Sequence, residues 1–246
     1  MPVNPSSETN ADEFSYSLTS LIAFLLAITL GAFSAVLLLP SWGFTLLKSL
    51  VGPDPKAYWY LSRGSAFVAL GLLWVSMVLG LLITNKVART WPGSPAAFAV
   101  HEYVSLLGLG IGIFHGLILM GDHYMNYQWA QILMPFGSEN YRPIWVGLGQ
   151  IGLYTWAIIS ASFYVRQKIG PKTWRFIHFA AFANFMLALI HGLGSGTDAS
   201  APWVQWVYWF FGGSILFLTV YRVIASVIPQ SPPAPARPVS TPQTPK

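Results

Sequence analysis

The stretch of sequence that decides the fold is FAVHEYVSLLGLGIGIFHGLILM, residues 98–120. It is long and apolar enough to cross a bilayer as a helix, yet it carries two imidazoles, His101 and His115. An ionisable side chain in a membrane-spanning helix is costly and by default indicates a functional site with a partner. A second apolar segment repeats the pattern with His178 and His191. Four of the five histidines in the chain therefore form two intramembrane pairs.

The composition independently indicates an integral membrane protein. Of the 246 residues, 54% are hydrophobic and only 9% are charged, and the mean hydropathy is +0.54. Soluble proteins have about 25% charged residues. Six segments have the length that a bilayer requires, namely residues 17–39, 64–84, 98–120, 144–165, 174–192 and 204–228. The sequence predicts an all-α integral membrane fold, a six-transmembrane-helix bundle over residues 17–228.

Two short flanks border this predicted domain. Residues 1–16 contain acidic side chains and no Lys or Arg, and the apolar stretch that follows is longer than a signal-peptide core. We therefore expect a retained helix after a cytoplasmic N-terminal segment. Residues 229–246 end in SPPAPARPVSTPQTPK, which is dense in proline and poor in apolar residues. This composition predicts a disordered tail with polyproline-II character.

The distribution of Lys and Arg predicts the orientation. With both termini cytoplasmic, the inner segments hold nine cations and the outer segments four, as the positive-inside rule requires. The inner set is Lys86, Arg89, Arg166, Lys168, Lys172, Arg175, Arg222, Arg237 and Lys246; the outer set is Lys48, Lys56, Arg63 and Arg142. The third and fifth spans then both run outward. His101 is thus expected beside His178 (the inner pair), and His115 beside His191 (the outer pair).

The spacing within the third span suits two stacked ligand sites. Fourteen residues separate His101 from His115, which is about 21 Å along a helix and returns close to the same face. Between them that face carries Ser105, Gly108 and Gly112, and small residues let a flat macrocycle approach the backbone. The partner that fits is haem, so the sequence predicts two bis-histidine haems b stacked across the bilayer.

The fifth span has a different spacing. Thirteen residues separate His178 from His191, about 20 Å, and an ideal helix leaves the second imidazole roughly 220° around from the first. The helix is therefore locally irregular, or its histidines serve cofactors on different sides. We expect an irregularity between them, and the glycines at 192, 194 and 196 favour the His191 end.

Further residues are candidates for supporting roles. Haem propionates require cations, and Arg63 at the outer site and Arg175 at the inner site each abut a span. The alternative is that both arginines are ordinary interfacial anchors. Phe182 and Phe185 lie near the middle of the fifth span, where they either occupy the gap between the haems or simply pack. Glu102, next to the inner ligand, is a weak candidate for proton-linked or quinol chemistry.

The segment between the third and fourth spans reads MGDHYMNYQWAQILMPFGSENYRP, residues 120–143. It is long for a turn and rich in aromatic side chains. Two interpretations are open: a lid that caps the outer haem, or an aromatic belt at the membrane interface.

Together these features resemble the ferric reductase-like transmembrane domain, the family of ferric-chelate reductases, NADPH oxidases and the haem subunit of the bacterial periplasmic methionine sulfoxide reductase system. The resemblance covers roughly residues 57–225 and rests on a His-x13-His third span with a His-x12-His fifth span. Local strings add to it: SRGSAFVALGLLWVSMVLGLLIT (62–84) and RPIWVGLGQIGLYTWAIISASFYVRQKIGPKTWRFIHFAAF (142–182).

The resemblance implies transmembrane electron transfer as the membrane subunit of a reductase in a bacterial inner membrane. The axial ligands of the two haem irons would be His101 with His178 and His115 with His191. One departure is that the chain has no Gly-rich phosphate fingerprint and no room for an FAD/NAD(P)H domain after the sixth span. The expected donor is therefore a separate flavoprotein or quinol, and the expected acceptor an outer-side protein or small molecule.

Other function classes are less favoured. A self-contained quinol-dependent reductase of ferric iron or oxygen is one alternative, and a haem-binding structural or accessory subunit of a larger complex is another. A transporter would place ionisable groups along a pathway, but Asp and Glu are almost absent from the spans. The chain has no cysteine, which excludes disulfides, covalent c-type haem and Cys-ligated iron–sulfur clusters. We expect membrane lipid around the chain and no nucleic-acid partner.

Overall fold

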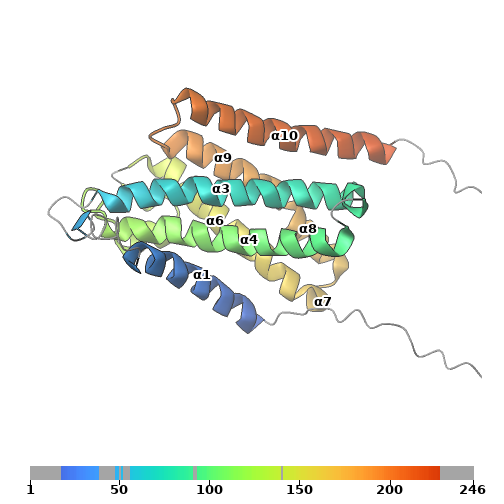
Figure 1. The fold of residues 1–246 in the computed structure, drawn as a ribbon, viewed down its shortest axis with the longest axis horizontal. Helices are drawn as coiled ribbons and strands as arrows, with labels where there is room; N and C mark the ends of the chain where they lie inside the picture. The colour runs from blue at the N-terminus through green and yellow to red at the C-terminus, as the bar shows by residue number, and fades with distance from the viewer. Residues whose placement is uncertain are drawn as a thin grey trace, which may run out of the picture.

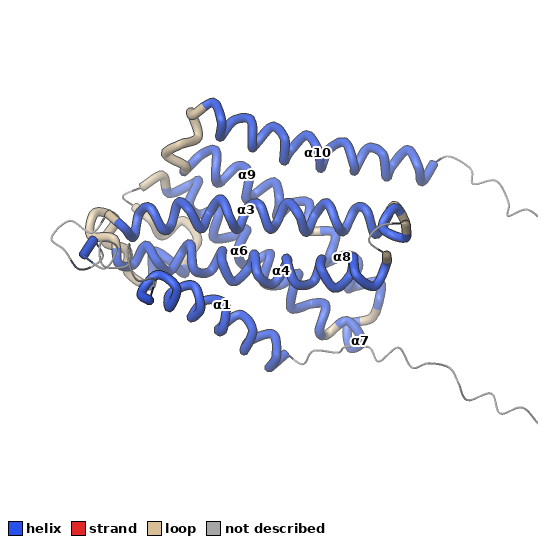
Figure 2. Tube along the Cα trace, viewed as in Figure 1, coloured by secondary structure: helices blue, strands red, loops and turns tan. Residues whose placement is uncertain are grey.

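The computed structural model describes residues 18–38, 48–49, 51, 56–90, 93–139 and 141–227. Within these residues every regular element is a helix (Figures 1 and 2). This confirms the all-α part of the prediction. The predicted N-terminal segment 1–16 and the tail 229–246 lie outside the described residues.

The helices follow the predicted spans with small shifts at their ends. The long ones are α1 (Leu18–Leu38), α3 (Ala57–Thr84), α4 (Ser94–Leu117), α6 (Pro143–Tyr164), α9 (Ala181–Ser195) and α10 (Pro202–Val227). The short ones are η1 (Val87–Arg89), η2 (Ile118–Gly121), α5 (Trp129–Leu133), α7 (Arg166–Ile169) and α8 (Pro171–Phe179). The largest shift is at α3, which begins seven residues before the predicted 64, so Arg63 lies inside a helix rather than before one.

In the part of the chain that the structure describes, five helical stretches are long and apolar enough to cross a membrane. They are Ala57–Thr84, Ser94–Gly121, Pro143–Tyr164, Pro171–Ser195 and Pro202–Val227. The chain therefore has the character of a multi-pass membrane protein. In α1 the apolar stretch is the shorter Ile22–Ala35, and a sixth span stays a prediction.

The bundle is built around the antiparallel pair α3 and α4, which pack along their whole length (Figure 1). Helix α1 packs on α4, α10 packs on α3, and α6 and α9 pack on each other behind this pair. The buried core joins side chains of α3, α4, α6, α9 and α10, among them Leu73, Leu109, Trp156, Phe185 and Ile215, and Leu25 of α1 packs against it. Helix α1 begins and α10 ends at the same end of the bundle, where α7 lies (Figure 1).

The two histidine-bearing stretches begin in the same way. A glycine with positive φ precedes each: Gly93 at 99° before α4 and Gly170 at 82° before α8. Both starts also carry a proline in the first turn, where its fixed φ suits a helix and its missing N–H costs nothing. His101 and His178 each lie seven residues after the first residue of their helical stretch. The shared start therefore places the inner pair at one depth.

The predicted irregularity between His178 and His191 is present. Helix α8 ends at Phe179 and α9 begins at Ala181, and the N–H of Ala180 bonds to the carbonyl of Ile177 at 3.0 Å, a tightened turn. The expected position at the His191 end was wrong, because α9 stays helical through His191 to Ser195. The glycines at 192 and 194 are accommodated within the helix, which ends only at Gly196.

The small residues of α4 lie close to a helix of the bundle. A Cβ built on Gly108 would lie 2.7 Å from Cη2 of Trp156, so this glycine faces an indole of α6, and the approach of a macrocycle to this face stays a prediction. Gly112 lies near Leu153 and the same indole, and it also lines the cavity described below. Glycine at 108 thus serves the close approach of α6 to α4.

We expect Gly108→Ala to destabilise the bundle by about 1–3 kcal/mol, the usual cost of overpacking a tight contact. The matched control is Gly71→Ala on α3, where a Cβ would meet nothing within 4 Å. That variant should gain up to about 1 kcal/mol from helix propensity. Thermal unfolding of the two purified variants in one detergent compares them directly, and equal melting temperatures would contradict the packing assigned to Trp156.

Candidate functional site

The structure brings the four intramembrane histidines together in the predicted combinations. The ring centroids of His101 and His178 lie 6.1 Å apart with their planes at 76°. Those of His115 and His191 also lie 6.1 Å apart, with planes at 73°. Each pair joins α4 to the α8–α9 stretch, so these two stretches run parallel as predicted. All four side chains are half-buried.

Helix α3 orients both histidines of α4. The Nδ1 of His101 lies 2.9 Å from the carbonyl oxygen of Ser76, and the Nδ1 of His115 lies 2.7 Å from the carbonyl oxygen of Ser62. A carbonyl only accepts, so each Nδ1–H donates and each Nε2 keeps its lone pair. This is the arrangement by which a second-shell carbonyl fixes the tautomer of a metal-ligating histidine.

The histidines of the α8–α9 stretch are held differently from each other. The Nδ1 of His191 donates to the carbonyl oxygen of Trp145 at 2.8 Å, and its ring lies directly on the backbone of Gly149 in α6. The ring of His178 instead stacks on the indole of Trp174, with centroids 5.2 Å apart and planes at 26°. His191 is therefore fixed by the backbone, and His178 by an aromatic surface.

The separation of the rings fits ligation of one metal by two opposed imidazoles. With a metal–nitrogen bond of about 2.0 Å and about 1.1 Å from nitrogen to ring centre, opposed ligands have centroids about 6.2 Å apart, and tetrahedral ligands about 5 Å. Both observed distances are 6.1 Å. Among the described residues no group of three or more His, Cys, Asp or Glu could hold a metal ion. The donor set fits haem, whose porphyrin supplies the other four ligands.

A cavity of about 430 Å³ opens beside the outer pair. Both His115 and His191 line it, and much of the rest of its wall is apolar, with Leu70, Leu153 and Ala188 among the lining residues. Ligand and cofactor sites commonly have volumes of about 300–1,000 Å³ and few polar groups. The cavity at the outer pair therefore has the volume and the largely apolar lining of a ligand or cofactor site.

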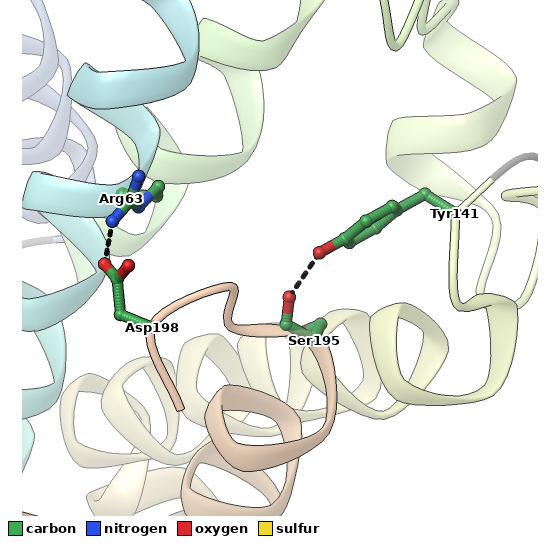
Figure 3. A network of polar contacts seen from close by, with 4 residues as sticks. All are labelled: Arg63, Tyr141, Ser195 and Asp198. Atoms are coloured by element: carbon green, nitrogen blue, oxygen red, sulfur yellow. Dashed lines mark hydrogen bonds and ion pairs between the residues drawn. The ribbon is translucent and has the colours of Figure 1, made fainter. Parts of the chain in front are cut away.

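Four residues that line this cavity form polar contacts in two pairs (Figure 3). Arg63 of α3 forms an ion pair with Asp198, which lies in the loop between α9 and α10. The hydroxyl of Tyr141 donates to the carbonyl oxygen of Ser195 at 2.7 Å. The Ser195 hydroxyl in turn lies 3.2 Å from Nδ1 of His191. These contacts tie the loop after α9 to α3 and to the segment before α6.

The two arginines predicted as propionate partners have different surroundings. Arg63 lines the outer cavity together with its partner Asp198. Arg175 lies on α8, less than one turn before His178, and its side chain is exposed. Arg63 is thus placed at a ligand-sized cavity, and a contact of either arginine with a propionate stays a prediction.

The segment between the third and fourth spans folds over the outer cavity. Met125 and Tyr127 are 2% and 4% exposed, and both line the cavity. Asp122 holds the turn by accepting hydrogen bonds from the N–H groups of Tyr124 and Met125. Burial raises the pKa of the Tyr127 hydroxyl, which lies 2.6 Å from the buried Ser138 hydroxyl. Met125 and Tyr127 therefore cover the cavity, whereas Tyr124, 88% exposed, faces outward, and a lid over a haem stays a prediction.

Trp156 lies in the middle of the bundle, between the two pairs. Its indole is 8% exposed and packs against Gly108 of α4, which lies midway between His101 and His115. Phe185 is buried in the same core cluster, and Phe182 is only partly buried beside it. Of the two phenylalanines considered from sequence, Phe185 therefore lies deeper, and Trp156 was not favoured by the sequence.

Sequence reasoning also missed the residues that orient the histidines. Ser62 and Ser76 are separated by fourteen residues, the same interval as His101 and His115. In an antiparallel helix pair, equal spacing brings both serines level with both histidines at once. The equal spacing could have predicted these serine–histidine contacts from the sequence. Gly149 could not have been selected in the same way, because the fourth span contains several glycines.

Comparisons with protein-family models, with curated proteins and with solved structures find no match for this chain. The likeness to ferric reductase-like domains therefore rests on the histidine spacing and the local strings alone. The geometry of the site carries the functional argument by itself.

We expect Gly149→Ala to disrupt the outer site. A Cβ at this position would lie 2.6 Å from Cε1 and 2.7 Å from Cγ of His191, so the imidazole must move away from the Trp145 carbonyl. Haem retained per purified chain should fall from about two to about one. Gly213→Ala on α10 is the matched control, because nothing lies within 4 Å of its Cβ. An unchanged haem content in Gly149→Ala would show that the outer site does not depend on the contact between the His191 ring and the backbone at position 149.

Proposed function

We propose that this chain carries electrons across the membrane through two bis-histidine haems b, from an inner-side donor to an outer-side acceptor, as the membrane subunit of a reductase. The observation that supports this best is the pair of 6.1 Å histidine separations. The two pairs are fourteen residues apart along α4, which is about 21 Å. This separation covers most of the hydrocarbon core of a bilayer, which is about 30 Å thick.

The residues of the chain have distinct roles in this proposal. Bound haem supplies one-electron redox chemistry. His101 and His178 would hold the inner iron, and His115 and His191 the outer iron, each through Nε2. The backbone carbonyls at the Nδ1 atoms fix the tautomer and the orientation of three of these imidazoles. Fixed ligands change little between oxidation states, which favours rapid electron transfer.

The lid segment supports an acceptor site that is separated from the outer metal centre. Met125 and Tyr127 cover the cavity, and the Arg63–Asp198 ion pair lies at its edge. These residues would exclude bulk water from the outer haem while leaving its edge near the surface. An acceptor protein or small molecule would then receive electrons without binding to the iron, because both axial positions are filled by histidines.

The donor is proposed to be a separate flavoprotein or a quinol. One contact favours the quinol. Glu102 follows the inner ligand His101 in the sequence, and its Oε1 accepts a hydrogen bond from the hydroxyl of Tyr164 at 2.9 Å. Oxidation of a quinol releases protons together with electrons, and a carboxylate at this depth is a suitable proton acceptor. A flavoprotein donor would not need this carboxylate.

Purified chain fully loaded with haem should contain two low-spin haems b and show a split or broadened reduced α-band. His115→Ala or His191→Ala should remove the outer haem, and His101→Ala or His178→Ala the inner one, because each iron loses an axial ligand. The pyridine haemochromogen assay measures the haem content of each variant, and reductive titration identifies the haem that remains. A ratio of one haem per chain in fully loaded material contradicts the pairing, as would loss of the same site in His101→Ala and His115→Ala.

We expect NADPH or NADH alone to leave the haems of the isolated protein oxidised, whereas dithionite reduces both. A quinol or a reduced flavoprotein should reduce them in turn, inner before outer. Stopped-flow absorbance at the α-band follows the reaction. Rapid reduction by NADPH without added protein would overturn the proposed donor, and a loaded protein that no such donor reduces would favour the accessory-subunit alternative. Glu102→Gln should slow reduction by quinol and leave the flavoprotein reaction unchanged if the quinol is the donor.

A further inference from the structure

Three buried side-chain atoms in the described part of the chain have no hydrogen-bond partner. They are Nε1 of Trp174 and both amide atoms of Asn85. Buried polar groups are almost always paired, so each such atom needs an explanation. Both residues lie at the inner end of the bundle: Trp174 on α8 and Asn85 at the end of α3. Unpaired polar atoms are therefore concentrated at one end of the molecule.

Trp174 lies directly against the inner pair. Its indole stacks on the ring of His178 with centroids 5.2 Å apart, and the ring of Phe163 on the neighbouring helix α6 lies 6.5 Å away. The four-residue step from Trp174 to His178 is one helical turn, so the two side chains share a face of α8. An indole N–H can only donate, and the group that it lacks is an acceptor beside His178.

The surroundings of the inner pair narrow the class of this acceptor. Two of the cations on α8, Lys172 and Arg175, are exposed and turned to solvent, and the nearby carboxylate of Glu102 is bonded to Tyr164. The N–H of Trp174 is therefore the buried donor beside His178 that still lacks an acceptor, and an anionic ligand group would supply one. A hydrogen bond to a charged acceptor is also worth more than one to a neutral group.

We propose that Trp174 is a binding residue for a carboxylate of the inner ligand, namely that its indole N–H donates to a propionate of the haem held by His101 and His178. The proposal rests on the proposed function, since it takes haem as the ligand. It differs from the prediction that Arg175 binds this group. In this role Trp174 would stack on the axial ligand His178 and would also bind the haem directly.

The experiment measures haem affinity at the inner site alone. Full-length apoprotein carrying His115→Ala, which leaves only the inner pair complete, is titrated with haem b and with haem dimethyl ester, whose propionates are blocked. Trp174→Phe keeps a stacking ring and removes the N–H. We expect this change to weaken haem b binding about tenfold and to leave binding of the dimethyl ester unchanged.

Two controls separate the hydrogen bond from the packing. Trp74→Phe removes an indole N–H that already donates to Ser214 at 2.8 Å, remote from α8, and should not change the affinity for haem b. Arg175→Gln tests the competing arginine in the same titration and should have less effect than Trp174→Phe. Trp174→Leu, which also removes the stacked ring, should weaken binding of both haem and its ester.

Other outcomes overturn the proposal. Equal weakening of haem b and the dimethyl ester by Trp174→Phe would assign Trp174 to packing only, and no weakening would remove it from the site. If Arg175→Gln alone shows the ester-dependent loss, the arginine is the propionate partner. The proposed function is tested separately. Unsubstituted protein that binds no haem would contradict both the proposed function and the role of Trp174. Protein that binds two haems but whose affinity does not change in Trp174→Phe would contradict only the role of Trp174.

Discussion

The structure depends most on the hydrogen bonds by which α3 fixes the two histidines of α4. The carbonyls of Ser62 and Ser76 accept from the Nδ1–H groups of His115 and His101 at 2.7 and 2.9 Å. A helical carbonyl already serves its own helix, but its second lone pair can accept again. Because the two helices are antiparallel and both intervals are fourteen residues, one register satisfies both contacts. A slip of one residue would break both, so the α3–α4 packing and the candidate site specify each other.

The second half of each pair must be supplied from a helix of different spacing, and this demand shapes the rest of the bundle. Thirteen residues of regular helix would turn His191 away from α4, and the tightened turn at Ala180 changes that angle. Helix α6 then has to admit the His191 ring against its backbone, which is possible because position 149 is a glycine. Two local departures, a tight turn and a missing side chain, thus compensate for one residue of spacing.

Much of this was readable from the sequence, for physical reasons that can be named. Apolar length predicted the helices, and depth predicted which histidines meet, because the bilayer and the helical rise leave few choices. The position of the break was not readable: the glycines at 192 and 194 can bend a helix but need not, and packing keeps them helical here. The indole of Trp156 against Gly108 was missed for a similar reason, since a glycine shows where something approaches but not what.

The two pairs differ in two ways that have opposite effects on the direction of the proposed electron path. The outer pair has both Nδ1 atoms on backbone carbonyls and lies under a lid that buries Met125. The inner pair has one such carbonyl, and its His178 rests on an indole beside exposed cations. An imidazole that donates to a carbonyl is a stronger ligand for the oxidised metal, which lowers the reduction potential of the metal centre. Burial under apolar side chains raises that reduction potential. The lid would have to outweigh the additional carbonyl for electrons to flow outward, so burial of the outer cavity is as necessary to the proposed function as the histidines themselves.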